Sequence, residues 1–410
     1  MLVYFQFKIM WSDFVDSLIK RTWAEINLDN LEYNYRVIRG RADKNAMLCC
    51  VIKADGYGHG AVQVAKLYEK LGADWFCVSN IEEALELRNN GISLPILILG
   101  YTPAECAEIL SRNNISQACY NIEYAESLSD YSVKQNVTVN IHLKLDTGMS
   151  RIGLMCQSFD RDAESIDIAE KICRLPNLYP QGVFTHFAVS DEAEEGRDFT
   201  FQQFDCFMFT VNELEKRGIK FDIRHCANSG AIIDYPLMHL DMVRAGIILY
   251  GLYPSEKLRG KIDLKPAMEL KSVVSLVKDV FEGSTVSYGR TYTVHKPIQK
   301  TATVPAGYAD GFIRKNAEKG YVSINGKKAK ILGRICMDQF IVDADNIENI
   351  KIGDTVTLFG CSENTPSADD IAKWNDTINY EVVCLISKRV ARVYLRNGRE
   401  VETVDRILNG

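Results

Sequence analysis

Eight short apolar runs recur over residues 47–247, and segments with helical spacing lie between most of them. Each run has the length and composition of a buried parallel strand. Eight strands alternating with helices over about 225 residues indicate a (β/α)8 barrel, with an open doubly wound sheet as the alternative. We favour the barrel because the strand count closes it and because polar residues stand at the strand ends. The expected strands cover residues 47–53, 75–79, 95–100, 115–120, 138–145, 181–187, 223–227 and 242–247.

Six helices are expected between these strands. Phenylalanines at helical spacing, Phe201, Phe204 and Phe207, mark the last of them. The expected helices cover residues 60–71, 81–90, 103–112, 122–134, 156–174 and 198–218.

The pattern changes after about residue 262, where short runs with Asn, Gly and Asp between them predict antiparallel strands. Asn325-Gly326 indicates a two-residue hairpin turn. A helix at 367–374 has a serine at its expected N-cap. The expected strands lie at 270–277, 301–304, 321–324, 330–332 and 355–358. We therefore expect an N-terminal extension at 1–20, the barrel at 21–260, and a mostly antiparallel β domain at 261–410.

The composition is that of an ordinary soluble globular protein, with 47% hydrophobic and 25% charged residues. A net charge of -6 gives no basic footprint, so nucleic acid is not an expected partner. The 12 cysteines form no C-x-x-C motif, which favours a reducing compartment, and we expect a cytoplasmic location. The six histidines show no zinc-ligand spacing, so no metal is expected.

No apolar stretch approaches about 18 residues, so we expect no membrane segment within this chain. The first 11 residues are apolar, but Gln6 and Lys8 interrupt them and no small-residue cleavage site follows. They do not resemble a signal peptide. We expect residues 1–20 to form an extra strand or helix, or to be the remnant of a longer segment.

The first expected strand ends on Lys53, and a turn with Gly56, Gly58 and Gly60 follows it. A lysine at the end of a buried strand costs desolvation free energy unless it is paired or used covalently. A lysine that reaches water at the barrel rim is the alternative. Because the chemistry of such barrels lies at the carboxyl ends of the strands, Lys53 is a candidate catalytic residue.

The loops after strands seven and eight are the usual phosphate site of such barrels. Ser229 offers a hydroxyl there, while Gly246 and Ile247 offer backbone N–H groups, although tight turns alone would also explain them. A lysine at one strand end and a phosphate cradle at others suggest pyridoxal phosphate, whose aldehyde forms a Schiff base with lysine. The remaining strand ends carry Lys144, Asp146, His186, Asn228 and Arg244.

Val-Ile-Lys-Ala-Asp-Gly-Tyr-Gly-His-Gly, residues 51–60, resembles the pyridoxal phosphate lysine motif of alanine racemases. Asp55 and Gly56 stand where Asn-Ala is commoner in that family. Eight further stretches resemble family motifs and follow in the family's order. They are residues 143–153, 185–187, 227–229, 243–247, 286–289, 305–311, 333–339 and 379–381.

The resemblance implies racemisation of L- and D-alanine by a two-base mechanism, which in bacteria supplies D-alanine for peptidoglycan. Lys53 would bind the cofactor and act as one base. Tyr288 would be the other base, supplied by the second subunit of a homodimer with shared active sites. His186 and Arg244 would form a hydrogen-bonded chain that lowers the pKa of this tyrosine. Arg244 would also face the pyridine nitrogen, and because arginine keeps its proton, the electron sink would be weak.

The resemblance also implies the binding groups. Arg151 would contact the cofactor's phenolic oxygen and the substrate carboxylate, which the backbone N–H of Met337 would also bind. Lys144 matches a position that is carbamylated in many members, where a carbamate would position Arg151. The cofactor's phosphate and its surroundings would be bound by Tyr57, Asn228, Ser229, Gly246, Ile247 and Tyr380. The entrance would be formed by Asp191, Tyr308, Arg314, Arg334 and Ile378.

Other functions remain open. A serine or broad-specificity amino-acid racemase has the same scaffold, and pocket contacts worth about 1–3 kcal/mol decide the substrate. Some relatives that act on serine carry membrane segments, and the apolar residues 1–20 keep that alternative open. A pyridoxal phosphate carrier protein resembles only the N-terminal half. A basic amino-acid decarboxylase is disfavoured because the substrate carboxylate must stay bound. Asp310 and Asp338 are expected to cap turns.

Overall fold

A computed structural model describes residues 21–159 and 162–408 of the 410-residue chain. The chain divides into two compact units, a barrel unit at residues 30–265 and a β unit that joins residues 266–408 to the described residues before Asn30. The expectations for residues 1–20 lie outside the described residues. Within the described part, no helix has both the length and the apolar character needed to span a membrane.

The barrel unit contains the eight expected parallel strands, hydrogen-bonded in the order β10-β2-β3-β4-β5-β6-β8-β9. The backbone N–H groups of Asp241 and Arg244 donate to the carbonyls of Arg224 and Ala227, at 3.1 and 3.0 Å, so β9 also adjoins β10. This closure confirms the barrel and excludes the open sheet. The eight strands are β2 (Met47–Val51), β3 (Trp75–Val78), β4 (Ile96–Ile98), β5 (Ile115–Cys119), β6 (Val139–Asp146), β8 (Leu178–Phe184), β9 (Ile223–His225) and β10 (Met242–Ala245). A ninth, short strand, β7 (Leu154–Met155), pairs only with β6.

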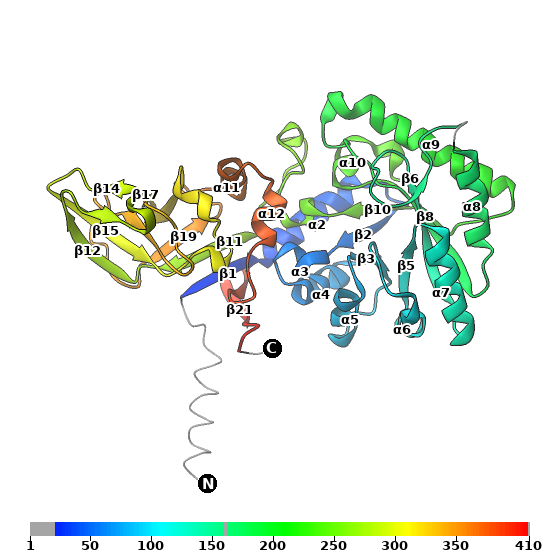
Figure 1. The fold of residues 1–410 in the computed structure, drawn as a ribbon, viewed down its shortest axis with the longest axis horizontal. Helices are drawn as coiled ribbons and strands as arrows, with labels where there is room; N and C mark the ends of the chain where they lie inside the picture. The colour runs from blue at the N-terminus through cyan, green and yellow to red at the C-terminus, as the bar shows by residue number, and fades with distance from the viewer. Residues whose placement is uncertain (1–20, 160–161, 409–410) are drawn as a thin grey trace, which may run out of the picture. The chain divides into compact units, whose positions relative to one another are not determined.

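Helices flank the barrel strands (Figure 1). The helix α4, for example, buries an apolar face that includes Val64, Ala65 and Tyr68. The helix expected at 156–174 begins only at Ala163. The carboxylate of Asp162 accepts the N–H groups of the preceding residues 157 and 158, which fixes a turn there instead. The helices are α2 (Leu28–Arg41), α3 (Lys53–Tyr57), α4 (Ala61–Leu71), α5 (Ile81–Asn89), α6 (Ala107–Arg112), α7 (Ile122–Lys134), α8 (Ala163–Cys173), α9 (Arg197–Lys216) and α10 (Ser229–Asp234).

The main sheet of the β unit has ten strands in the order β12-β15-β18-β17-β16-β19-β11-β1-β20-β21, and β13 and β14 form a separate pair. Its strand β1 (Thr22–Asn27) pairs antiparallel with β11 and parallel with β20. Residues 21–260 were expected in the barrel, so the position of β1 differs from that expectation. The reason is pairing on both edges, since the strand buries Trp23 and Ile26 and leaves neither edge to solvent.

The hairpin at Asn325-Gly326 forms as expected, with φ of 50° and 73°, and it joins the paired residues Ile324 and Lys327. The expected helix also forms, and Ser367 and Asp370 cap it reciprocally. The remaining elements of the β unit are β11 (Met268–Val273), β12 (Leu276–Phe281), β13 (Thr285–Val286), β14 (Tyr292–Thr293), β15 (Ile298–Val304), β16 (Tyr321–Ile324), β17 (Lys327–Leu332), β18 (Phe340–Asp343), β19 (Thr355–Phe359), α11 (Ala368–Asn375), α12 (Asn379–Cys384), β20 (Ala391–Arg396) and β21 (Arg399–Val404).

A buried carboxylate ties together the turns of the β unit. Asp310 is fully buried, accepts the N–H of Gly307, and pairs with Arg21 at 2.5 Å and Arg389 at 3.1 Å. The guanidinium of Arg389 also pairs with Asp338 at 2.8 Å. Asp310 therefore caps a turn, as expected, and it also neutralises two arginines.

Candidate active site

Lys53 directly follows β2 and opens a turn with a left-handed backbone. Residues 54–56 have φ values of 53°, 55° and 59°. The left-handed region costs an L-residue roughly 1–2 kcal/mol and glycine much less, which explains Gly56. The turn is tied down on both sides, because Asp55 Oδ1 accepts the N–H of Ala61 at 2.9 Å and Glu83 accepts the N–H of Ala54 at 2.7 Å. Lys53 therefore projects from a fixed backbone at the barrel's carboxyl-terminal rim.

Three of the residues predicted to bind phosphate meet at one point. The Ser229 hydroxyl accepts the N–H of Gly246 at 2.9 Å. A Cβ atom at Gly246 would lie 3.0 Å from the Tyr57 hydroxyl and 3.4 Å from that of Ser229. The Tyr57 ring packs on Tyr250 at a centroid distance of 4.8 Å. Two hydroxyls and the turn that begins at Ile247 thus surround a space that only glycine leaves open, and these groups fit a phosphate.

The side chain of Asn228 is used inside the fold. Its Oδ1 accepts the N–H of Ala231 at 3.0 Å and the hydroxyl of Ser190 at 2.7 Å. Its amide nitrogen donates to the carbonyl of Phe187 at 3.3 Å. Asn228 therefore caps α10 and fixes the place of Ser229, the first residue of that helix.

Arg244 and His186, which were predicted to interact, lie together inside the barrel. Nη2 of Arg244 donates to the carbonyls of Thr185 at 2.8 Å and Cys226 at 3.1 Å, and lies 3.5 Å from Nδ1 of His186. Burial, followed by the charges of Arg244 and Lys144, holds the pKa of His186 well below its ordinary value. The imidazole is therefore neutral beside a permanent cation.

Lys144 is a buried amine among cations. It is 4% exposed, and its Nζ lies 4.6 Å from the centre of the Phe184 ring. It makes no hydrogen bond or ion pair with any residue in the ranges 21–159 and 162–408. Burial and the charges of Arg244 and Arg151 lower its pKa well below the ordinary lysine value. A lowered pKa favours the uncharged, nucleophilic form of this amine. Arg151 itself is exposed in the loop after β6.

In the β unit, Tyr288 and Arg334 share one corner. Tyr288 is 66% exposed and stands in a short 3-10 turn. The hydroxyl of Ser287 donates to the carbonyl of Arg334 at 2.5 Å. A Cβ atom at Gly289 would lie 2.7 Å from the guanidinium of Arg334. The predicted base and this predicted entrance residue are therefore neighbours.

Tyr308 and Met337 lie on two turns that are bonded to each other. The N–H of Tyr308 donates to Cys336 at 3.3 Å, and the N–H of Ala309 donates to Met337 at 3.1 Å. The N–H of Met337 itself donates to no residue that the structure describes, so it is available to a ligand. Gly307 permits the close approach, because a Cβ there would lie 2.3 Å from both of these carbonyl oxygens.

The other predicted residues stand on separate elements. Asp191 follows β8 in the barrel unit, and burial raises the pKa of its carboxyl. Arg314 is exposed in a 3-10 turn of the β unit. Ile378 is exposed where α12 begins, and Tyr380 is half-buried in that helix.

Two buried histidines escaped the sequence interpretation. His142 and His225 are fully buried on β6 and β9, and Nδ1 of the first lies 2.9 Å from Nε2 of the second. The alternation of side chains along β6 could have identified them, because it shows which residues face the barrel interior. Leu143 and Leu145 point to one face, while His142 and Lys144 share the other, which faces the barrel interior.

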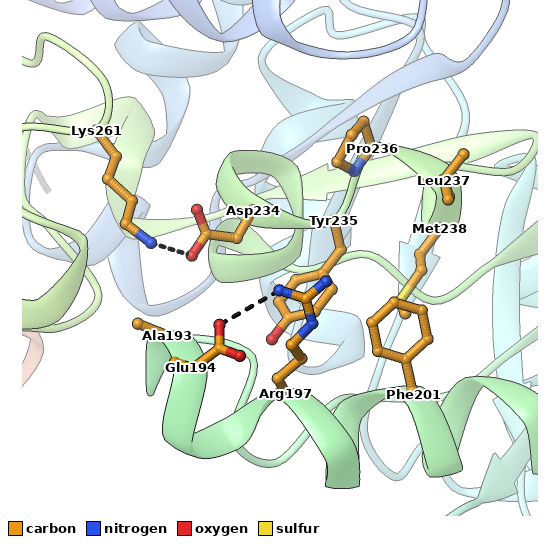
Figure 2. Close-up of a pocket in the computed structure, with 10 residues that line it drawn as sticks. All are labelled: Ala193, Glu194, Arg197, Phe201, Asp234, Tyr235, Pro236, Leu237, Met238 and Lys261. Carbon is orange, nitrogen blue, oxygen red and sulfur yellow. Dashed lines mark hydrogen bonds and ion pairs between the residues drawn. The ribbon is translucent and has the colours of Figure 1, made fainter.

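A separate cavity of about 290 Å³ lies in the barrel unit beside the start of α9 (Figure 2). Its charged groups are paired with one another, Arg197 with Glu194 at 3.3 Å and Lys261 with Asp234 at 2.6 Å. Its described lining includes none of the predicted site residues. The lining residues are Ala193, Glu194, Arg197, Phe201, Asp234, Tyr235, Pro236, Leu237, Met238 and Lys261.

Comparison with known proteins gives matches over most of the chain. The sequence matches the family models described as alanine racemase, N-terminal domain, over residues 26–254, and alanine racemase, C-terminal domain, over residues 267–394. Alanine racemase 1 of Clostridium acetobutylicum is 44% identical over 94% of this chain and 98% of its own length.

Two solved structures are similar throughout. An alanine racemase of Clostridium difficile is 43% identical with a TM-score of 0.89, covering 95% of this chain and 100% of that one. An alanine racemase of Bacillus anthracis with bound L-Ala-P is 33% identical with a TM-score of 0.89, covering 95% and 99%. Since both family models and near full-length relatives match, the chain belongs to the alanine racemase family.

Proposed function

We propose that this chain interconverts L- and D-alanine with pyridoxal phosphate as its cofactor, and that in a bacterial cell the D-alanine serves peptidoglycan synthesis. The observation that carries the proposal is the joint placement of Lys53, the Gly246 cradle and the Arg244–His186 contact at one end of the barrel. Relatives named alanine racemase, at 44% identity, support the choice of substrate.

The barrel residues fit the cofactor. Lys53 would hold it covalently, and Tyr57, Ser229, Gly246 and Ile247 would surround its phosphate, joined by Tyr380 of a β unit. When bound, pyridoxal phosphate withdraws electrons from the substrate's Cα and so makes that carbon acidic. Arg244 would donate a hydrogen bond to the pyridine nitrogen, and because a guanidinium keeps its proton, that nitrogen stays unprotonated.

Racemisation needs one base on each face of Cα. The Lys53 amine would move the proton on one face and the Tyr288 phenol on the other. Tyrosine has an ordinary pKa of about 10, so the phenolate needs help. The neutral imidazole of His186 beside the Arg244 cation provides a hydrogen-bond partner and a positive field for that oxygen.

We propose that Tyr288 acts in the active site of a second copy of the chain. Tyr288 is 66% exposed on its own unit, so water surrounds its phenol. A catalytic base must be shielded from water so that it exchanges protons with the substrate's Cα and not with solvent. Tyr308, Met337 and Ile378 add exposed apolar surface on the same unit, as expected of an interface. If each copy supplies its Tyr288 to the barrel of the other, the assembly is a homodimer with two shared active sites.

The substrate carboxylate would be bound by the exposed guanidinium of Arg151 and by the free N–H of Met337. Lys144 supports this role if its neutral amine adds CO₂. The nitrogen lone pair forms the N–C bond, the amine loses a proton to water, and a carbamate anion results. That anion would offset the two neighbouring arginine charges and hold Arg151 in place.

Asp191, Tyr308, Arg314, Arg334 and Ile378 would line the path by which substrate enters, a role that their position at turns and helix ends permits. All 12 cysteines are free thiols, which supports a reducing compartment such as the cytoplasm.

The test is chemical. Protein loaded with pyridoxal phosphate is reduced with borohydride, digested, and analysed by mass spectrometry, and the cofactor is expected on Lys53. Racemisation is then assayed with alanine, serine, lysine and arginine, and alanine is expected to give the highest kcat/KM. Label on another lysine would refute the assignment of Lys53, and a preference for serine would move the proposal to a serine racemase.

A further inference from the structure

The barrel interior holds two histidines that the proposed chemistry does not use. His142 Nδ1 lies 2.9 Å from His225 Nε2, and His225 Nδ1 lies 2.9 Å from Nη1 of Arg244. We propose that His142 and His225 are positioning residues, a chain of two neutral imidazoles with fixed tautomers that orients the Arg244 guanidinium. The inference rests on the proposed role of Arg244 opposite the cofactor's ring nitrogen.

The tautomers follow from donor and acceptor counting. A guanidinium only donates, so Nδ1 of His225 must accept and carries no proton. A neutral His225 then has its proton on Nε2, which it donates to Nδ1 of His142. His142 therefore keeps its own proton on Nε2. A second proton on either ring would place N–H against N–H in one of the two contacts.

No carboxylate of the described residues pairs with Arg244, so no anion there would make a charged histidine favourable. Its other acceptors in the described ranges are the carbonyls of Thr185, His225 and Cys226, and Nδ1 of His186 lies 3.5 Å from its Nη2. The groups that act on it electrostatically are the thiols of Cys49, Cys77 and Cys226, all buried. Burial lowers the pKa of His142 to about 3, and burial with the Arg244 charge lowers that of His225 well below its usual range.

The neighbouring strand is built around the contact between the two rings. Gly182 on β8 pairs with His142 in register. A Cβ atom at Gly182 would lie 2.4 Å from Nδ1 of His142 and 2.9 Å from its Cγ. Any other residue there would push the His142 ring away from His225. The need for glycine is therefore independent evidence that this ring position matters.

The chain of imidazoles ends at His142, whose ring also lies near the side chain of Gln181. Nε2 of His142 is buried without a hydrogen-bond partner in the described ranges, and the indole of Trp75 packs on the ring at 5.4 Å. An unpartnered N–H costs free energy. The proton on Nε2 of His142 cannot move to Nδ1 without breaking the hydrogen bond from His225. The Arg244 guanidinium therefore determines the tautomer of both rings, through its hydrogen bond to His225.

The direct test is nitrogen NMR of the cofactor-loaded enzyme with ¹⁵N-labelled histidine. Single His142→Asn and His225→Asn variants assign the two signals. Both residues are expected to show the neutral Nε2–H tautomer and no titration between about pH 5 and 8, where an ordinary histidine titrates. A doubly protonated ring, or a proton on Nδ1 of either residue, would overturn the proposal. This measurement requires no racemase activity. It therefore tests the histidine tautomers independently of the proposed function.

A pair of variants tests the consequence for the cofactor. In His142→Asn, the amide oxygen can replace Nδ1 as acceptor, so the cofactor's absorbance spectrum and kcat are expected to stay near wild type. In His142→Leu, His225 loses its acceptor and Arg244 its orientation. A changed spectrum and a kcat reduced by about tenfold, with a smaller change in KM, are expected.

His239→Leu is the matched control. His239 is equally buried in the barrel unit, accepts a hydrogen bond at Nδ1 from Asp43 N at 3.0 Å, and also has an unpartnered Nε2 within the described part of the chain. Its loss is expected to lower the melting temperature and leave the cofactor spectrum unchanged. Identical spectra and kcat in both His142 variants would contradict the proposal. If His142→Leu does not fold, the NMR result alone decides.

Discussion

The two units place their functional groups in opposite ways. In the barrel unit, Arg244, Lys144 and the histidines around them are buried, and the fold's own carbonyls and rings fix them. In the β unit, the buried charge of Asp310 ties turns together, while Tyr288 and Met337 extend from those turns into solvent. Under the proposed function, the barrel would carry a preformed cofactor environment, and the β unit would carry groups that act only when a second copy of the chain covers them.

Replacing Tyr288 by Phe gives the largest expected effect on activity. Loss of one general base should lower kcat for alanine by about 10²–10⁴-fold. Because the hydroxyl is exposed, the melting temperature and the cofactor spectrum should not change. Tyr101→Phe, an equally exposed tyrosine of the barrel unit, is the control in the racemisation assay. A destabilised Tyr288→Phe protein would show that this residue belongs to the fold as well.

Asp310→Asn tests whether the buried carboxylate of the β unit has a structural role. The change leaves Arg21 and Arg389 without their shared carboxylate and should lower the free energy of unfolding by about 3 kcal/mol. The cofactor spectrum, which reports on the barrel, should remain that of the wild type. Denaturant titrations followed by circular dichroism and by cofactor absorbance separate the two quantities. An altered cofactor spectrum in the folded variant would contradict this division of roles.

The buried histidines predict how stability depends on pH. His142 has a folded-state pKa lowered to about 3, below the unfolded value of about 6.5. Its stabilising contribution is therefore complete above about pH 6.5 and is lost as pH falls toward 3, at up to about 1.4 kcal/mol per pH unit. Denaturant titrations over this range should show a shallower slope for His142→Asn. Parallel curves for the two proteins would disprove the lowered pKa.

The smallest expected effect is that of Gly246→Ala. The added Cβ would lie 3.0 Å from the Tyr57 hydroxyl, inside the proposed phosphate cradle, and should weaken cofactor binding by about tenfold, or about 1.4 kcal/mol. Gly40→Ala, with open space around it, is the control when affinity is measured by absorbance titration. Equal affinities would place the phosphate elsewhere.

The sequence predicted correctly those features that depend on a short local pattern of residues. The eight barrel strands lie within a few residues of their predicted positions, because each is a short apolar run with a polar residue at its end. Lys53, His186 and Arg244 could be selected for the same reason. The hairpin at Asn325-Gly326 is likewise determined by two residues that accept a positive φ.

Features that depend on distant partners could not be predicted. Nothing within residues 22–27 indicates that β1 pairs with strands that begin at Met268 and Ala391. The His142–His225 contact joins strands 83 positions apart and depends on Gly182 of a third strand. The late start of α8 depends on hydrogen bonds made by one aspartate, which override helical spacing.

The position of β1 has a consequence for how the protein is made. Figure 1 shows this first strand, in blue, next to β11 of the same sheet, and its other neighbour is β20. Trp23 pairs with Ala391, and 391 − 23 gives 368 residues of separation. At a synthesis rate of about 5–20 residues per second, the strand waits roughly 20–70 s for its parallel partner. For most of that time the barrel is still being synthesised. The strand can pair with β11 as soon as β11 has emerged, so only the edge that faces β20 stays open until the end.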